Sequence, residues 1–190
     1  MIFLSRRQVF PIVSLVAFVL STSGCSRETG QTKSGESAAV SSTAPSMIVN
    51  TPVSGAGNQL STSVMFHDNA GQMNISELFL LISDPARGAD GTGGCVEWYK
   101  RSTGDVYLLD DAGKGWLGPR KAGSKGVLVN SQCLISMGNT GLGEVNGDLQ
   151  WVTSVGFAQG FSGPKNIYAK ALNRQNQEGN FALVGTWTVK

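Results

Sequence analysis

The chain has 190 residues, enough for one domain with a substantial core, and its 15 Lys and Arg stand against 13 Asp and Glu. Two of the basic residues, Arg6 and Arg7, lie in a leader-like segment, so the remainder has 13 basic and 13 acidic residues and is close to neutral. This balance argues against nucleic-acid binding, and short apolar runs among 25 glycines are typical of an all-β domain.

Residues 1–24 have the pattern of a signal peptide. The two arginines precede an apolar run of 12 residues, which is too short to span a bilayer comfortably. Small residues lead to Gly24-Cys25, which resembles the end of a bacterial lipobox, although Thr22 stands where Leu is usual. We therefore expect export and lipid attachment at Cys25, with ordinary signal cleavage as the alternative. The arginine pair also resembles a twin-arginine signal, so both export routes stay open.

Residues 25–45 are expected to form a flexible tether. Of the 20 residues 26–45, 14 are Ser, Thr, Gly, Ala or Pro and none is aromatic, so the segment cannot bury enough surface to order itself. As a coil it would reach roughly 20–30 Å. A lipid, a tether and a domain over residues 46–190 together predict a protein anchored in the cell envelope by its lipid.

Short strand patterns follow one another through residues 46–190, separated by turn residues. Residues 60–66 alternate between apolar and polar, whereas residues 77–83 form a continuous apolar run that predicts a strand buried on both faces. About nine strands and no long amphipathic helix predict two packed antiparallel sheets, a β-sandwich. The expected strands are 47–53, 60–66, 77–83, 95–100, 105–110, 126–135, 148–157, 166–172 and 181–190.

The C-terminal segment, IYAKALNRQNQEGNFALVGTWTV, resembles the last hairpin of immunoglobulin-like or fibronectin-III-like domains. Together with LSTSVMFHDNAG, the Cys-led strand, YLLDDAGKGW and NSQC, it resembles an uncharacterised group of bacterial immunoglobulin-like domains from secreted or surface proteins. The resemblance covers most of residues 46–190. It implies an immunoglobulin-like antiparallel β-sandwich and a surface location, and it brings no activity with it.

Two cysteines remain when Cys25 is set aside. Because an exported chain meets an oxidising compartment, we expect a disulfide between Cys95 and Cys133. The alternative is a pair of free buried thiols.

The orientation of the first of these cysteines depends on its strand. Alternation places Val96 and Trp98 on one face and Cys95, Glu97 and Tyr99 on the other. If Trp98 faces the core, the disulfide lies on an outer face or an edge of a sheet and not between the two sheets.

The sequence offers no catalytic motif, and we expect a protein that is not an enzyme and needs no cofactor. His67 is the only histidine, which excludes sites that need two, and we expect it at the surface. G-x-S-x-G is absent, and Ser162 and Lys165 have S-x-x-K spacing only in an expected loop. A hydrolase on a sandwich scaffold is a remote alternative.

Acidic turns suggest a weak calcium hypothesis. Asp110 and Asp111, with Asp105 as a third ligand, offer the hard oxygen atoms that Ca²⁺ prefers. Turns also use Asp for backbone reasons, which is the plainer explanation.

Aromatic residues suggest a ligand platform, because flat rings stack on sugars in lectin-like sandwiches. The candidates are Trp116, Tyr99, Tyr107 and Phe161. We expect a non-catalytic surface module for binding, adhesion or structure, with an envelope protein or glycan as partner and recognition in the long segments 84–94 and 111–126. A carbohydrate-binding module is the alternative.

Overall fold

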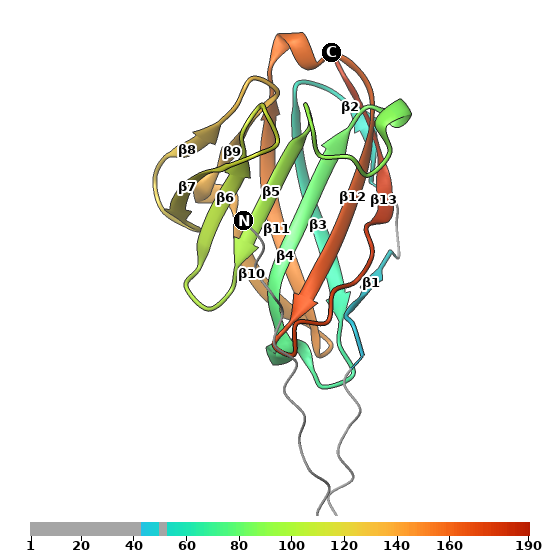
Figure 1. Ribbon diagram of the computed structural model, residues 1–190, viewed down its shortest axis with the longest axis vertical. Coiled ribbons are helices and arrows are strands. Elements are labelled where there is room, and N and C mark those ends of the chain that lie inside the picture. The colour runs from blue at the N-terminus through green and yellow to red at the C-terminus, as the bar shows by residue number, and fades with distance from the viewer. Residues whose placement is uncertain (1–42, 50–52) are drawn as a thin grey trace, which may run out of the picture. The chain divides into compact units, whose positions relative to one another are not determined.

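The computed structural model describes residues 43–49 and 53–190; the leader, Cys25 and most of the tether lie outside these residues. The described residues form a β-sandwich of two sheets, with four short 3₁₀ turns and no α-helix among them. Sheet B lies in front of sheet A in Figure 1. The turns are η1 (Gln72–Asn74), η2 (Pro85–Arg87), η3 (Met137–Asn139) and η4 (Gln159–Phe161).

Thirteen strands make up the two sheets. Sheet A has the order β1 (Ser46–Ile48), β3 (Gln59–His67), β11 (Asp148–Phe157), β9 (Cys133–Ser136) and β8 (Val127–Val129), with β10 (Gly141–Val145) also paired to β11. Sheet B has the order β2 (Val53–Ala56), β13 (Ala182–Val189), β12 (Gly163–Asn173), β4 (Ile75–Ser83), β5 (Cys95–Lys100), β6 (Asp105–Leu109) and β7 (Trp116–Lys121). Every pairing is antiparallel except β2 with β13, which is parallel, so sheet B is mixed.

The number of strands was underestimated from the sequence because two expected strands are each divided. The expected strand 47–53 is two strands, and the chain passes from sheet A to sheet B between them. The expected strand 126–135 is a hairpin of β8 and β9. Its turn is held by Asn130, whose Oδ1 accepts hydrogen bonds from the backbone N–H groups of Gln132 and Cys133.

Two further strands lie where the sequence predicted turns or loops. β7 falls within the expected loop 111–126, and β10 contains two glycines and only two apolar side chains. Neither shows clean apolar alternation, because each is at or near an edge of its sheet and has few core contacts to make.

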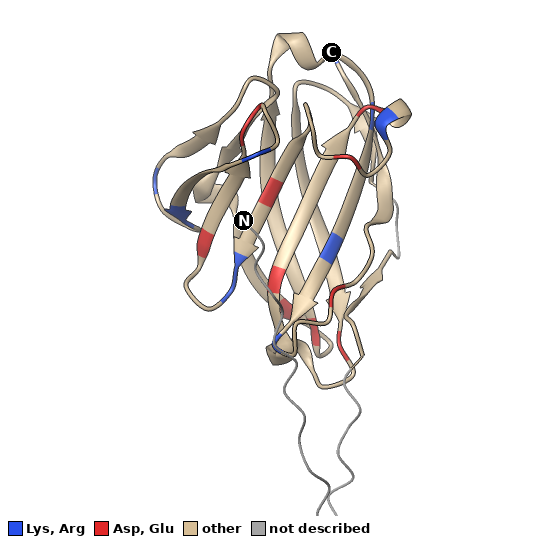
Figure 2. Ribbon diagram, in the orientation of Figure 1, with Lys and Arg blue, Asp and Glu red and all other residues tan. Residues whose placement is uncertain are grey.

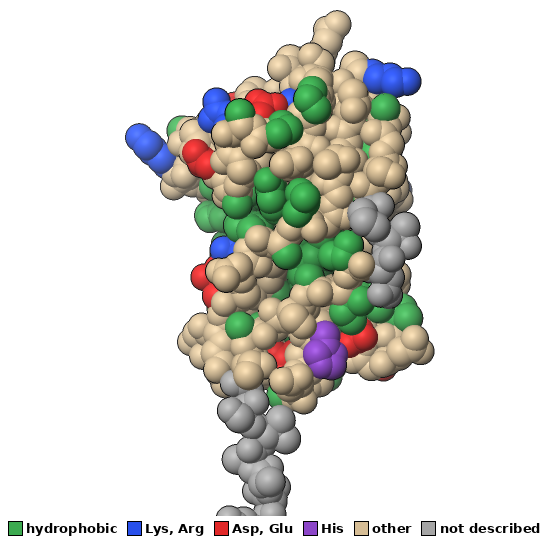
Figure 3. All heavy atoms as spheres, turned by 90° about the vertical axis from the view of Figure 1, so that its right-hand side faces the viewer, with side chains coloured by type: hydrophobic (Ala, Val, Ile, Leu, Met, Phe, Trp, Pro, Cys, Tyr) green, Lys and Arg blue, Asp and Glu red, His purple; other side chains and the backbone are tan. Residues whose placement is uncertain are grey.

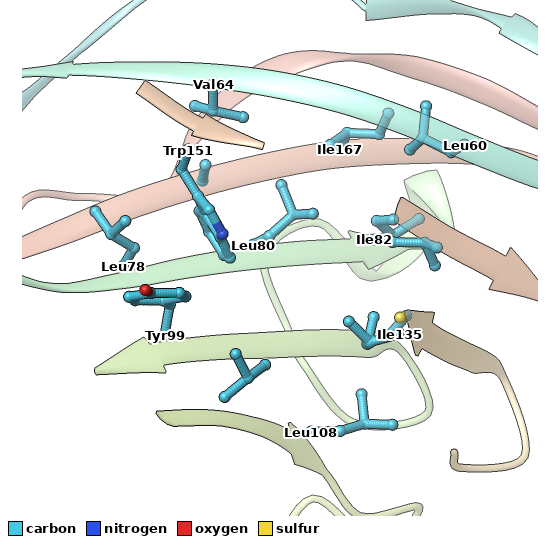
Figure 4. Close-up of a cluster of buried hydrophobic side chains, with 14 of the residues drawn as sticks. Leu60, Val64, Leu78, Leu80, Ile82, Tyr99, Leu108, Ile135, Trp151 and Ile167 are labelled. Atoms are coloured by element: carbon cyan, nitrogen blue, oxygen red, sulfur yellow. The ribbon is translucent and has the colours of Figure 1, made fainter. Parts of the chain in front are cut away.

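The core lies between the sheets and is built by alternate residues of the central strands. In β3, Leu60, Thr62, Val64 and Phe66 are buried, as their spacing predicts. Figure 4 shows side chains from both sheets meeting around the ring of Trp151, which is fully buried. The other fully buried large side chains are Leu60, Phe66, Ile75, Leu78, Leu80, Leu81, Ile82, Leu108, Ile135, Met137 and Leu149.

The predicted disulfide between Cys95 and Cys133 is present, with a Cα–Cα distance of 5.8 Å. The condition for an outer position, Trp98 in the core, is not met. Cys95 on β5 of sheet B and Cys133 on β9 of sheet A are each only 2% exposed, so the bond crosses the core between the two sheets. Alternation along β5 was correct, but Trp98 faces outward, and Cys95, Glu97 and Tyr99 face the core.

Candidate functional site

Four aromatic side chains lie side by side across the outer face of sheet B; we call them the aromatic row. They are Phe79 on β4, Trp98 on β5, Tyr107 on β6 and Trp116 on β7. Trp98 stacks on Tyr107 at 4.5 Å between ring centroids and on Phe79 at 6.0 Å, and it meets Trp116 at 5.2 Å with the ring planes tilted by 60°. The order follows the sheet, because Phe79 is the cross-strand partner of Trp98, and Trp98 is the partner of Tyr107.

Exposure varies along the aromatic row. Trp116 stands on the edge strand and is 39% exposed, while the other three rings are partly buried by one another. Phe79 and Trp98 were not among the sequence candidates, because their strands are apolar on both faces and rings at such positions are usually core. Their outward direction becomes visible only from the pairing of the strands.

A row of charged residues runs beside the aromatic row. The next cross-strand positions on the same face are Glu77, Lys100, Asp105 and Lys121, so that the signs alternate from strand to strand. Lys121 Nζ lies 2.7 Å from the carboxylate of Asp105. Figure 2 shows that the strands of sheet B otherwise carry few charged residues. Most of the charged residues in the view lie at strand ends and in loops.

A lysine ends the aromatic row on the β12 side. Lys170 is the cross-strand partner of Phe79, and its Nζ lies 5.0 Å from the ring centroid of Phe79 and 4.5 Å from that of Phe181. The same ammonium pairs with Glu178. Apolar and cationic groups therefore continue the row toward β13.

The loop 84–94 covers another part of the same face. Leu81 points outward from β4 and is nevertheless fully buried, and Val96 beside it is 5% exposed. A Cβ atom built at Gly94 would lie 3.2 Å from Leu81, and one at Gly91 would lie 3.0 Å from Val96. The loop therefore covers this part of the sheet, whereas the aromatic row and its charged neighbours stay open.

The structure brings together two of the four aromatic candidates. Trp116 and Tyr107 belong to the aromatic row. Tyr99 faces the core, where its ring lies 6.2 Å from Trp151 and burial raises the pKa of its hydroxyl. Phe161 is 5% exposed and packs under an ammonium group, so neither of these two rings contributes to an exposed platform.

The three calcium candidates do not converge. Asp105 is paired with Lys121, and Asp110 accepts backbone hydrogen bonds of its own turn, which lower the pKa of its carboxyl group. Asp111 binds the backbone N–H and the hydroxyl of Ser131 at 2.8 and 2.9 Å. Within residues 43–49 and 53–190, no group of three or more His, Cys, Asp and Glu side chains is arranged to hold a metal ion.

His67 lies at the surface, as its place on the polar face of β3 predicts (Figure 3). Its Nδ1 is 2.7 Å from Asp148 Oδ1, and its Nε2 is 3.3 Å from Asn69 Oδ1. The hydrogen bond to Asp148 raises the pKa of the imidazole. With half of the side chain exposed, this pair is a surface link between β3 and β11.

Sequence reasoning gave no role to Glu97, a carboxyl group that is buried between the two sheets. Its side chain is 1% exposed, and Oε2 accepts a hydrogen bond from Thr153 Oγ1 at 2.8 Å. Oε1 has no hydrogen-bond partner among the described residues. Burial raises the pKa of Glu97 from 4.5 to about 8, against a smaller lowering by Thr153. The carboxyl group is therefore protonated at neutral pH.

No protein-family model, curated protein or solved structure matches this chain. None of the helices within the described residues is long and apolar enough to cross a membrane.

Proposed function

We propose that this protein is a non-catalytic binding module of the bacterial cell envelope, attached by a lipid on Cys25, and that it contacts its partner through the aromatic row. The observation that carries the binding role is the run of four adjoining rings, Phe79, Trp98, Tyr107 and Trp116, on an outer sheet face. Aromatic side chains are enriched in recognition surfaces, where a few of them supply most of the binding energy.

The anchor is supported by the sequence alone. A leader with two arginines and an apolar run of 12 residues ends at Gly24-Cys25, and a polar tether separates this cysteine from the sandwich. Such a tether leaves the sandwich free to meet partners near the membrane surface. The described residues begin at position 43, so Cys25 lies outside them.

The lipid anchor can be tested by metabolic labelling. In cells fed labelled palmitate, we expect wild-type protein to incorporate the label and to partition with the membrane. Cys25→Ala should do neither, because the acceptor thiol is absent. Cys95→Ala is the matched control, since it removes a cysteine that lies in a disulfide, and it should label like wild type. Equal labelling of the Cys25→Ala protein would contradict the anchor.

The binding face can be tested by a pair of substitutions with equal exposure. Trp116 is 39% exposed in sheet B, and Val152 is 40% exposed in sheet A. Full-length protein would be used to isolate a partner from the native envelope fraction, and its Kd would then be measured with the purified partner. We expect Trp116→Ala to weaken binding about 30-fold, as the loss of roughly 2 kcal/mol at an aromatic contact implies, and Val152→Ala to bind like wild type. The reverse pattern would move the interface to sheet A.

A glycan is the second candidate for the partner, and the exposure of Trp116 favours it. This ring is tilted by 60° from Trp98 and stands at the open end of the aromatic row, where it can contact a sugar ring. Titration of full-length protein with purified peptidoglycan fragments should then quench tryptophan fluorescence. The quench should disappear in Trp116→Ala. If a purified envelope protein binds and the peptidoglycan fragments cause no quench, the partner is a protein and not a glycan.

We also infer that the sandwich is immunoglobulin-like, of the variable type. The order β1-β3-β11 in one sheet and β13-β12-β4-β5-β6 in the other agrees with the strand order of such domains, in which two extra strands extend the sheet that holds the C-terminal hairpin. The cross-sheet disulfide joins β5 and β9, whereas antibody domains join two other strands. A crystal structure with different strand connections would overturn this inference.

A further inference from the structure

The outer face of sheet A carries a hollow centred on a glycine. Gly156 on β11 is flanked in the neighbouring strands by its partners Gln59 on β3 and Leu134 on β9, and the next strand contributes Val129. Because the central position has no side chain, the longer neighbours surround an open space of about 430 Å³. The hollow lies toward the end of the sandwich where β11 leads into η4 and where the C-terminus is found (Figure 1).

A second hollow of about 590 Å³ adjoins the first, and the two share Asn58 and Phe157. Gln159 and Ser162 lie on its wall. Both volumes fall in the range of about 300–1,000 Å³ that is usual for small-molecule sites. The partly buried Phe157 packs against the core and lines both hollows, and its ring lies 6.1 Å from that of Phe161.

Apart from Ser162 and Lys190 in the second hollow, the polar side chains of the two hollows are uncharged amides. Asn58 and Gln59 line the first hollow and Gln159 the second, all three are exposed, and none of their amide groups hydrogen-bonds to a described residue. An amide offers one acceptor and two donors, which suits pairs of sugar hydroxyls. No carboxylate side chain lines either hollow, and the only charged side chain is Lys190 in the second.

We propose that these adjoining hollows on sheet A form a binding site for a neutral saccharide, with Phe157 contacting the apolar C–H face of the sugar and the amides of Asn58, Gln59 and Gln159 binding its hydroxyls. An apolar ring together with uncharged donors and acceptors matches the two kinds of surface that a pyranose presents. The site is separate from the aromatic row, which lies on the outer face of the other sheet, and it does not depend on the function proposed for that row.

Two glycines provide a matched test. A Cβ atom at Gly156 would meet Leu134 at 3.9 Å, an ordinary contact, and one at Gly141 on β10 would meet nothing within 4 Å. Neither glycine has a positive φ, so Val fits the backbone at both positions. Gly156→Val fills the hollow, whereas Gly141→Val adds the same side chain to the same sheet outside the hollow. Gln59→Leu keeps the bulk of its side chain and removes only the amide.

Saturation-transfer NMR on full-length protein, with glucose, N-acetylglucosamine, cellobiose and chitobiose as probes, would measure binding. We expect at least one probe to bind wild-type protein with a millimolar Kd. Gly156→Val should bind this probe at least tenfold more weakly, and Gln59→Leu severalfold more weakly. Gly141→Val should have an unchanged Kd. Trp116→Ala should also leave the Kd unchanged. The proposal is overturned if no probe binds wild-type protein, if Gly156→Val binds normally, or if Trp116→Ala abolishes binding, which would place the sugar on the aromatic row.

Discussion

Wild-type protein is expected to lose stability steadily as the pH rises from about 4.5 to about 8, whereas Glu97→Gln should lack this loss. The folded protein holds a proton on Glu97 up to a pKa of about 8, while the unfolded chain releases it near the ordinary value of 4.5. In this interval the unfolded state binds fewer protons than the folded state, so the free energy of unfolding falls with pH. The separation of the two pKa values corresponds to a total loss of up to about 5 kcal/mol.

The physical cause of the raised pKa is desolvation by burial, which no neighbouring charge among the described residues offsets. No Lys, Arg or His pairs with Glu97 among the described residues, and the groups near its carboxyl are hydroxyls, with Thr153 as donor and Thr140 3.2 Å beyond it. A carboxylate in this position would be desolvated without a partner. The protonated carboxyl group of Glu97 has one acceptor and one donor. The amide of Gln is the neutral side-chain group that resembles this protonated carboxyl most closely.

The comparison of the two proteins isolates this one group. Urea unfolding at pH 5, 7 and 9 would be followed by tryptophan fluorescence for wild-type and Glu97→Gln protein. His67, whose pKa is also raised and whose contribution is also lost with rising pH, is present in both and cancels in the difference. We expect similar stability at pH 5 and a clear advantage for Glu97→Gln at pH 9. Parallel pH profiles would show that the buried carboxyl does not titrate as inferred.

Local patterns predicted the central strands well and the outer ones poorly. β3 and β11 pair in sheet A and bury one face each, so their alternation in the sequence reports the core directly. The sequence prediction placed β1 and β2 in one strand, because the chain has an extended, apolar pattern both before and after it passes from sheet A to sheet B. β7, with its exposed residues, carries almost no core signal.

β5 explains why the candidate site could be predicted only in part. Both of its faces are covered, one by the core and one by the rings of the aromatic row, so alternation separates Trp98 from Cys95 and Glu97 without saying which side is inner. The usual tendency of Trp to be buried and Glu to be exposed does not hold on this strand. Tyr107 and Trp116 could be named from composition, but their meeting with Phe79 depends on strand register, which the sequence does not reveal.

Removal of the disulfide is expected to lower the free energy of unfolding by about 4 kcal/mol. Cys95 and Cys133 are 38 positions apart in the sequence, and cross-linking a loop of this length restricts the unfolded chain by roughly that amount. The double variant Cys95→Ala and Cys133→Ala avoids buried, unpaired hydroxyls that Ser would introduce at two positions only 2% exposed.

Two readouts distinguish this loss from simple damage to the core. In urea, the double variant should have a lower midpoint and a larger m-value, because its unfolded chain is less restricted and exposes more surface. A reductant should destabilise wild-type protein to the same extent and leave the double variant unchanged. A difference below 1 kcal/mol, or an added effect of reductant on the variant, would contradict the entropic origin of the stabilisation.

The position of the disulfide also predicts which strands lose stability most when the bond is removed. The loop that it closes contains β6, β7 and β8, and β7 and β8 are the edge strands of their sheets on this side of the sandwich. The disulfide joins the strands next to these elements, β5 in sheet B and β9 in sheet A. Hydrogen exchange in the double variant should therefore rise most in β6–β8 and least in β3, β4 and β12 at the sheet centres. Uniformly faster exchange would mean that the bond stabilises the whole sandwich and does not act mainly on this edge.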